Sequence, residues 1–325
     1  MADGRPSASS YVRPFGADAP WNVPVANLPK HPQSDLYASR LYNNSTAARP
    51  GNFNSSFIDY TYPVFYTEDA TTTYTVRGGY STTNGSINGS SIPWNPAWSA
   101  APGTDAQIIL LDAKTGKEWD LWQVSISGST LSVSGGSQVG GDYRTKQDCW
   151  QYSRGIGCQY LAMLVRPEEI ARGRIDHALS MTAINTSHTF YVAPATKLEH
   201  SGSEVANPIP EGMRFALDVT DAQIESWVAT KPASYQKLAR AVGYALRDYG
   251  WFITDTSGGA SLQFEAQASA GALWKAQGVD PASSTATNLT DGLITQGRIY
   301  AIVPSDQYPN QSLAPPNPPT GITAN

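Results

Sequence analysis

The segment from residue 117 to residue 123 carries two carboxylates and two indole rings. If this segment forms a strand, its side chains alternate between two faces, so Glu118, Asp120 and Trp122 share one face while Trp119 lies on the other. Two carboxylates are costly to bury unless they bind or pair with something. A carboxylate pair beside a stacking ring is what glycoside cleavage requires. We therefore expect Glu118 and Asp120 to be catalytic and Trp119 or Trp122 to stack on a sugar; the alternative is a solvated hairpin face.

The same segment, Glu-Trp-Asp-Leu-Trp-Gln, resembles the Glu-x-Asp-x-x-Glu strand of glycoside hydrolase family 16, whose members have a jelly-roll fold. The resemblance implies that Glu118 is the nucleophile and that Asp120 tunes it. The family's last glutamate, the acid/base, is replaced here by Gln123, which cannot donate and retake a proton. The family's complete mechanism is therefore not carried over to this chain.

A second cluster, Gly-Arg-Ile-Asp-His-Ala-Leu-Ser, lies at residues 173–180. In a strand, His177 would belong to an apolar face, with Arg174 and Asp176 on the opposite face. Histidine is the natural general base near neutral pH. We expect His177 to be a catalytic base or acid and Arg174 and Asp176 to contact substrate; the alternative is a core histidine bonded to a neighbour.

Two cysteines, Cys149 and Cys158, enclose an aromatic, glycine-containing loop. Their proximity predicts a disulfide and an oxidising compartment, with free thiols as the alternative. With no histidine nearby, they do not make a zinc site, and no metal is expected. Arg154, within the loop, is suited to gripping a carboxylate or sugar hydroxyls. The alternative for Arg154 is a structural ion pair.

Together these clusters predict a polysaccharide lyase or hydrolase. A lyase needs a base and an arginine but no carboxylate pair, which fits Gln123. The wider pattern, including Arg-Pro-Glu-Glu-Ile-x-x-Gly-Arg-Ile-Asp-His-Ala-Leu at 166–179, resembles a set of secreted, largely uncharacterised bacterial proteins over most of the chain. That resemblance implies secretion and a shared fold.

The composition excludes several classes of function. The net charge of −5 and the lack of basic runs argue against a nucleic-acid partner. No apolar run approaches the ~20 residues that span a bilayer, so we expect no membrane insertion. Phosphate-loop and dinucleotide motifs are absent from the sequence, so we expect no cofactor. No signal peptide is visible, and we expect an extracellular protein, either secreted or on a virion surface, whose partner is a polysaccharide or cell-surface glycan.

Short runs of β-branched and aromatic residues between Gly, Ser, Asn and Pro predict a mainly β fold, a two-sheet β-sandwich or jelly roll with a few short helices. The predicted strands are 58–66, 72–77, 107–112, 118–125, 129–134, 175–183, 189–192, 213–217, 251–255, 261–266 and 298–303. The predicted helices are 166–172, 221–229 and 235–249.

Proline-rich stretches mark both ends of the chain. We expect an extended arm at 1–35, a single β-sandwich domain at 36–304 and a polyproline-like tail at 305–325. Such arms suggest a rival function, a non-enzymatic virion or cell-surface assembly protein, such as a decoration, a fibre or a glycan-binding component. In that case the arms would tie subunits into a homo-oligomer or a larger assembly.

Overall fold

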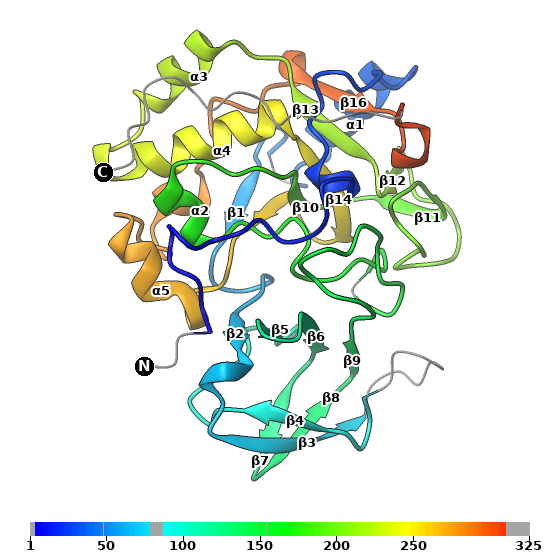
Figure 1. Cartoon of the computed structure of the whole chain (residues 1–325). Coiled ribbons are helices and arrows are strands. Elements are labelled where there is room, and N and C mark those ends of the chain that lie inside the picture. The colour runs from blue at the N-terminus through cyan, green and yellow to red at the C-terminus, as the bar shows by residue number, and fades with distance from the viewer. Residues whose placement is uncertain (1–3, 48, 79–86, 154, 310–325) are drawn as a thin grey trace.

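The computed structural model describes residues 4–47, 49–78, 87–153 and 155–309. Within these residues the chain is mainly β, with sixteen strands in four sheets and a few short helices (Figure 1). The predicted fold class is confirmed. Every predicted strand overlaps an observed one, because short β-branched and aromatic runs suit a pleated, half-buried surface.

Two four-stranded sheets form a β-sandwich, the lower part of Figure 1. One sheet has the order β2 (Val64–Tyr66), β5 (Ile108–Asp112), β6 (Lys117–Trp122), β9 (Gly135–Gln138). The other has the order β4 (Ser91–Trp94), β3 (Thr72–Gly78), β8 (Thr130–Val133), β7 (Ser125–Ser127). Alternate apolar residues of both sheets meet in one core; Val76 and Leu131 come from one sheet, Leu110 and Leu121 from the other.

A larger mixed sheet forms the upper part of Figure 1. Its order is β1 (Asn54–Ser56), β15 (Ser261–Gln263), β10 (Leu179–Ala183), β14 (Trp251–Thr256), β13 (Arg214–Leu217), β16 (Ile299–Ile302). A two-stranded sheet pairs β11 (Thr186–Tyr191) with β12 (Ile209–Glu211). Since both four-stranded sheets lie between residues 64 and 138, the sandwich is an insertion between β1 and β10 of the larger sheet.

The three predicted helices correspond to α2 (Pro167–Arg172), α3 (Asp221–Val228) and α4 (Gln236–Asp248). Thr220 and Gln223 form the capping box that starts α3. Leu238 and Val242 on α4 pack into the core of the larger sheet, and α4 is followed by Gly250 at φ +68°. Three further helices were not predicted, namely α1 (Ser34–Asn43), α5 (Gln267–Ala276) and α6 (Ser284–Thr287).

The N-terminal segment packs on the rest of the same chain. Nε of Arg5 lies 2.5 Å from a Glu168 carboxylate oxygen, and its Nη2 lies 2.5 Å from Glu265. The predicted boundary at residue 35 falls inside α1, and most of the predicted tail lies outside the described residues. Among the described residues, no helix combines the length and apolar character needed to cross a membrane.

Candidate functional site

A cleft of about 1100 Å³ lies between the sandwich and the larger sheet. The sandwich contributes residues of β6 and β9, and the larger sheet contributes residues of β1, β10, β14 and β15. Strands β10 and β14 are parallel, and Thr182, Asp255 and Thr256 line the cleft where these strands end. Open sheets commonly bind ligands outside the carboxyl ends of parallel strands, so this cleft is the leading candidate site.

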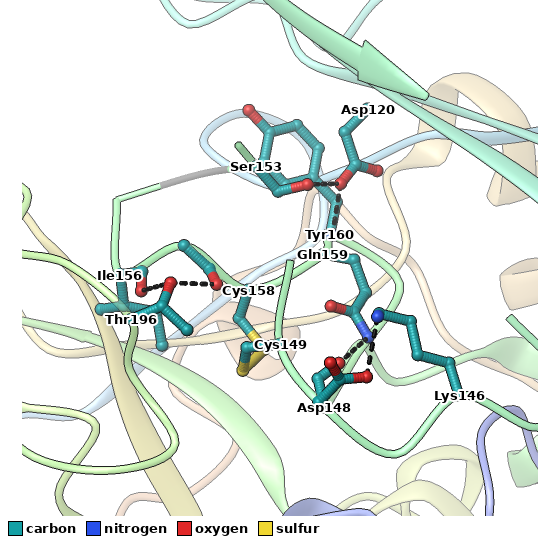
Figure 2. The surroundings of a disulfide bond; sticks show 11 residues. Asp120, Lys146, Asp148, Cys149, Ser153, Ile156, Cys158, Gln159, Tyr160 and Thr196 are labelled. Carbon is teal, nitrogen blue, oxygen red and sulfur yellow. Dashed lines mark hydrogen bonds and ion pairs between the residues drawn. A yellow bond between two sulfur atoms is a disulfide. The ribbon is translucent and has the colours of Figure 1, made fainter. Parts of the chain in front are cut away.

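Strand β6 forms the sandwich wall of the cleft. As the alternation predicted, Glu118 and Asp120 lie on one face of β6, and both Asp120 and Trp122 line the cleft. Oδ2 of Asp120 accepts hydrogen bonds from Ser153 Oγ and from the backbone N–H of Tyr160, at 3.0 Å for the latter (Figure 2). These donors stabilise a negative charge on Asp120 and fix its orientation.

Glu118 is fully buried behind Asp120, and its Oε1 accepts the backbone N–H of Leu161 at 3.0 Å. Burial, followed by the neighbouring Asp120 carboxylate, raises the pKa of Glu118 well above its usual range. Both effects favour the protonated form of Glu118 over its carboxylate. Of the two carboxyl groups, Asp120 is the one that lines the cleft.

The disulfide between Cys149 and Cys158 is confirmed. It closes the loop that carries Ser153, and Tyr160 follows this loop directly after Gln159; Ser153 and Tyr160 both hydrogen-bond Asp120, as Figure 2 shows. The loop is also tied to the segment after β11, because Thr196 Oγ1 donates to the carbonyl of Gly157 at 2.9 Å.

The predicted substrate clamp Arg154 lies outside the described residues.

The opposite wall carries a second group of carboxylates. Glu199 and Asp255 line the cleft, and Glu199 Oε2 accepts the backbone N–H of Thr256 at 2.7 Å. Behind them, Glu211 accepts the backbone N–H of Glu199 at 3.0 Å. Burial chiefly, with a further contribution from the charge of Asp255, raises the pKa of Glu211 to about 7. Burial also lowers the pKa of Lys197, a cleft residue beside these carboxylates.

The disulfide loop joins the two walls. Ser153 hydrogen-bonds Asp120, while a Cβ added to Gly155 would lie 3.1 Å from Asp255 Oδ1. Ser153 therefore lies against the carboxylate of one wall and Gly155 against a carboxylate of the other. Asp255 and Glu199 were not among the predicted site residues. Asp255 ends a predicted strand, but the parallel pairing that brings that strand end to the cleft leaves no signal in the sequence.

The structure places His177 away from this cleft. It precedes β10, is buried, and lines a separate cavity of about 10 Å³. Its Nδ1 lies 2.8 Å from the carbonyl of Ala178 and its Nε2 lies 3.0 Å from Glu169. Burial lowers the pKa of His177, but the Glu169 carboxylate outweighs that effect and raises it. Both ring nitrogens therefore lie within hydrogen-bond distance of fixed partners.

Two other predicted contact residues lie near His177 and not in the cleft. Arg174 donates from Nε to Asp176 Oδ2 at 2.8 Å, forming a local ion pair. Trp119 faces the core of the sandwich, on the side of β6 opposite to the cleft. Of the predicted site residues described by the structure, Glu118, Asp120 and Trp122 are brought together, and Trp119, Arg174, Asp176 and His177 are not.

Within the described ranges, no group of three or more His, Cys, Asp and Glu side chains is arranged to hold a metal ion. Comparison with protein-family models, curated proteins and solved structures finds no match for this chain.

Proposed function

We propose that this protein is an extracellular glycoside hydrolase that cleaves a polysaccharide in the cleft between the sandwich and the larger sheet. The observation that carries the proposal is the pair of carboxylate groups on opposite walls of one cleft, Asp120 from β6 and Asp255 with Glu199 from the other side. Hydrolysis of a glycosidic bond uses one ionised carboxylate and one carboxylic acid on either side of the bond.

Asp120 is the ionised partner. Its neighbour Glu118 holds the proton of the buried pair, and the donors from Ser153 and Tyr160 stabilise the remaining charge. In that state Asp120 can stabilise the positive charge that develops on the sugar ring, or attack its anomeric carbon.

The opposite wall supplies the proton. Asp255, Glu199 and Glu211 crowd together, and like charges at close range oppose full ionisation of such a group. Because the pKa of Glu211 is about 7, about half of the molecules hold a proton on Glu211 at neutral pH. In the proposed reaction the proton held by Glu211 passes by way of the cleft-lining carboxylates Glu199 and Asp255 to the leaving glycosidic oxygen, and the bond between that oxygen and the anomeric carbon breaks. Water then supplies the new hydroxyl group and returns its other proton to Glu211.

Aromatic side chains complete a sugar-binding surface. Trp122 and Tyr152 line the cleft, and amphipathic rings provide a flat apolar face with a polar edge. A lyase is less well supported, since the predicted base His177 has both ring nitrogens engaged outside the cleft. The assembly function is also less well supported, because Arg5 of the N-terminal arm is used within its own chain.

The test is a panel of neutral, cationic and anionic polysaccharides assayed for new reducing ends and for the ultraviolet absorbance of unsaturated uronates. We expect reducing ends without that absorbance, and loss of activity in Asp120→Asn. Asp218→Asn is the matched control, since Asp218 is 76% exposed and lies outside the cleft. Absorbance from unsaturated products would identify a lyase, and an Asp120→Asn variant with full activity would overturn the assignment.

A further inference from the structure

The cleft also indicates which class of glycan it accepts. We propose that the substrate carries free amino groups, and that a protonated amine binds to the sandwich wall beside Trp122. This inference rests on the proposed function and names the substrate of the same site.

The first support is the charge of the cleft. Among the described lining residues, five are carboxylates and one is a lysine, together with His200. Lys197 lies beside acids of its own wall, whose charges act to keep it protonated against the effect of burial. The described lining residues therefore carry an excess of negative charge. A cleft lined by one sign of charge concentrates ligands of the opposite sign and repels polyanions such as uronate or sulfated glycans.

The second support is a set of buried acceptors. Gln107 is 3% exposed and lines the cleft, yet its Oε1 has no hydrogen-bond partner, while its Nε2 is oriented toward Asp105 at 3.5 Å. Ser55, 4% exposed on the facing sheet, also has an unpaired Oγ at the cleft. Unpaired buried polar atoms are costly, so these atoms indicate a ligand that brings donors.

An ammonium group matches this arrangement. It offers three donors and no acceptor, whereas a hydroxyl offers one donor. Ile109 pairs with Asp120 in the sheet, and continuing that register places Gln107 opposite Trp122 on the same face. The acceptor, the ring and the ionised carboxylate therefore form one contiguous strip. A sugar stacked on Trp122 can direct its amine to Gln107 and Asp105 while its anomeric carbon approaches Asp120.

The experiment measures binding without turnover. Full-length Asp120→Asn protein is titrated calorimetrically with oligomers of glucosamine, N-acetylglucosamine and glucose of equal length and linkage. We expect the glucosamine oligomer to bind roughly tenfold more tightly than the other two, the gain typical of a charge-assisted hydrogen bond. This preference should shrink as salt is added. It should also shrink in the double variant Asp105→Asn/Asp120→Asn, but not in Asp218→Asn/Asp120→Asn.

The outcomes separate the two proposals. Equal binding of all three oligomers, or a preference for the acetylated or neutral one, overturns the amine-binding inference, while wild-type hydrolysis of any of them keeps the proposed function. A preference for glucosamine without any cleavage by the wild-type protein confirms the ligand class and overturns the hydrolase. Absence of both binding and cleavage overturns both proposals.

Discussion

Replacing Cys149 and Cys158 together by serine opens the loop whose Ser153 hydrogen-bonds Asp120 in the cleft. The cysteines are nine residues apart. The loss of loop-closure entropy for a ring of this length corresponds to ~2.7 kcal/mol at about 25 °C. With an unfolding entropy of ~2.1 cal/mol/K per residue over the chain of 325 residues, this predicts a fall in Tm of ~4 °C.

The functional loss should exceed what this modest destabilisation explains. The opened loop no longer fixes Ser153 and Tyr160 against Asp120, and a misplaced catalytic group can cost roughly 100-fold in rate. Thermal unfolding by circular dichroism and the reducing-end assay on the same samples measure both effects. Ser153→Ala is the control, because it removes one bond to Asp120 and keeps the disulfide. A double cysteine variant that melts and turns over like the wild type would refute this reasoning.

The remaining predictions concern buried charge. Arg5→Ala should lower the unfolding free energy in denaturant titrations by about 3 kcal/mol, because fully buried Glu265 loses one arginine partner and keeps Arg166. The partly exposed pair of Arg240 is the control, and Arg240→Ala should cost less than about 1 kcal/mol. Burial raises the pKa of Glu265, but Arg166 and Arg5 together lower it to about 2. The ionised Glu265 therefore stabilises the fold above ~4.3, the pKa of a glutamate in the unfolded chain, and this stabilisation is lost as the pH falls toward 2. In an acid titration Arg5→Ala should therefore unfold at a higher pH than the wild type. The pKa of Glu211 is about 7, above its unfolded value, so the folded state holds a proton that the unfolded state has released. The free energy of unfolding should therefore fall as the pH rises from ~4.3 to about 7 and then level off. Glu211→Gln should remove this pH dependence and raise the free energy of unfolding by ~3 kcal/mol in mild alkali. An unchanged pH dependence in this variant would contradict the raised pKa of Glu211.

The alternation of β6 was the most informative part of the sequence. A strand period of two placed Glu118, Asp120 and Trp122 on one face, and the structure keeps them together at the cleft. The disulfide was also predictable, because Cys149 and Cys158 are close in sequence and the chain contains no other cysteine. Both features depend on local geometry.

Features set by distant segments could not be predicted. A strand through His177 was expected, but the backbone N–H of Ala178 donates to the carbonyl of Trp21 in the N-terminal segment at 2.7 Å, and β10 begins at Leu179. Asp255 reaches the cleft because β14 pairs in parallel with β10, more than sixty residues earlier in the chain. Neither contact leaves a periodic signal in the sequence.

The insertion of the sandwich into the larger sheet has a consequence for synthesis on the ribosome. Every strand of the sandwich has been translated once residue 138 is added. By contrast, β1 has no pairing partner until β15 is translated, and the larger sheet is complete only after β16, which ends at Ile302. At roughly 5–20 residues per second, the sandwich can close some 10–30 s before the sheet that carries it. The arm must wait as well, because Arg5 meets Glu265 only after 260 further residues have been added. During that interval the nascent chain exposes the unpaired edge of β1 and the apolar face of α1, and these are the surfaces on which a chaperone would be needed.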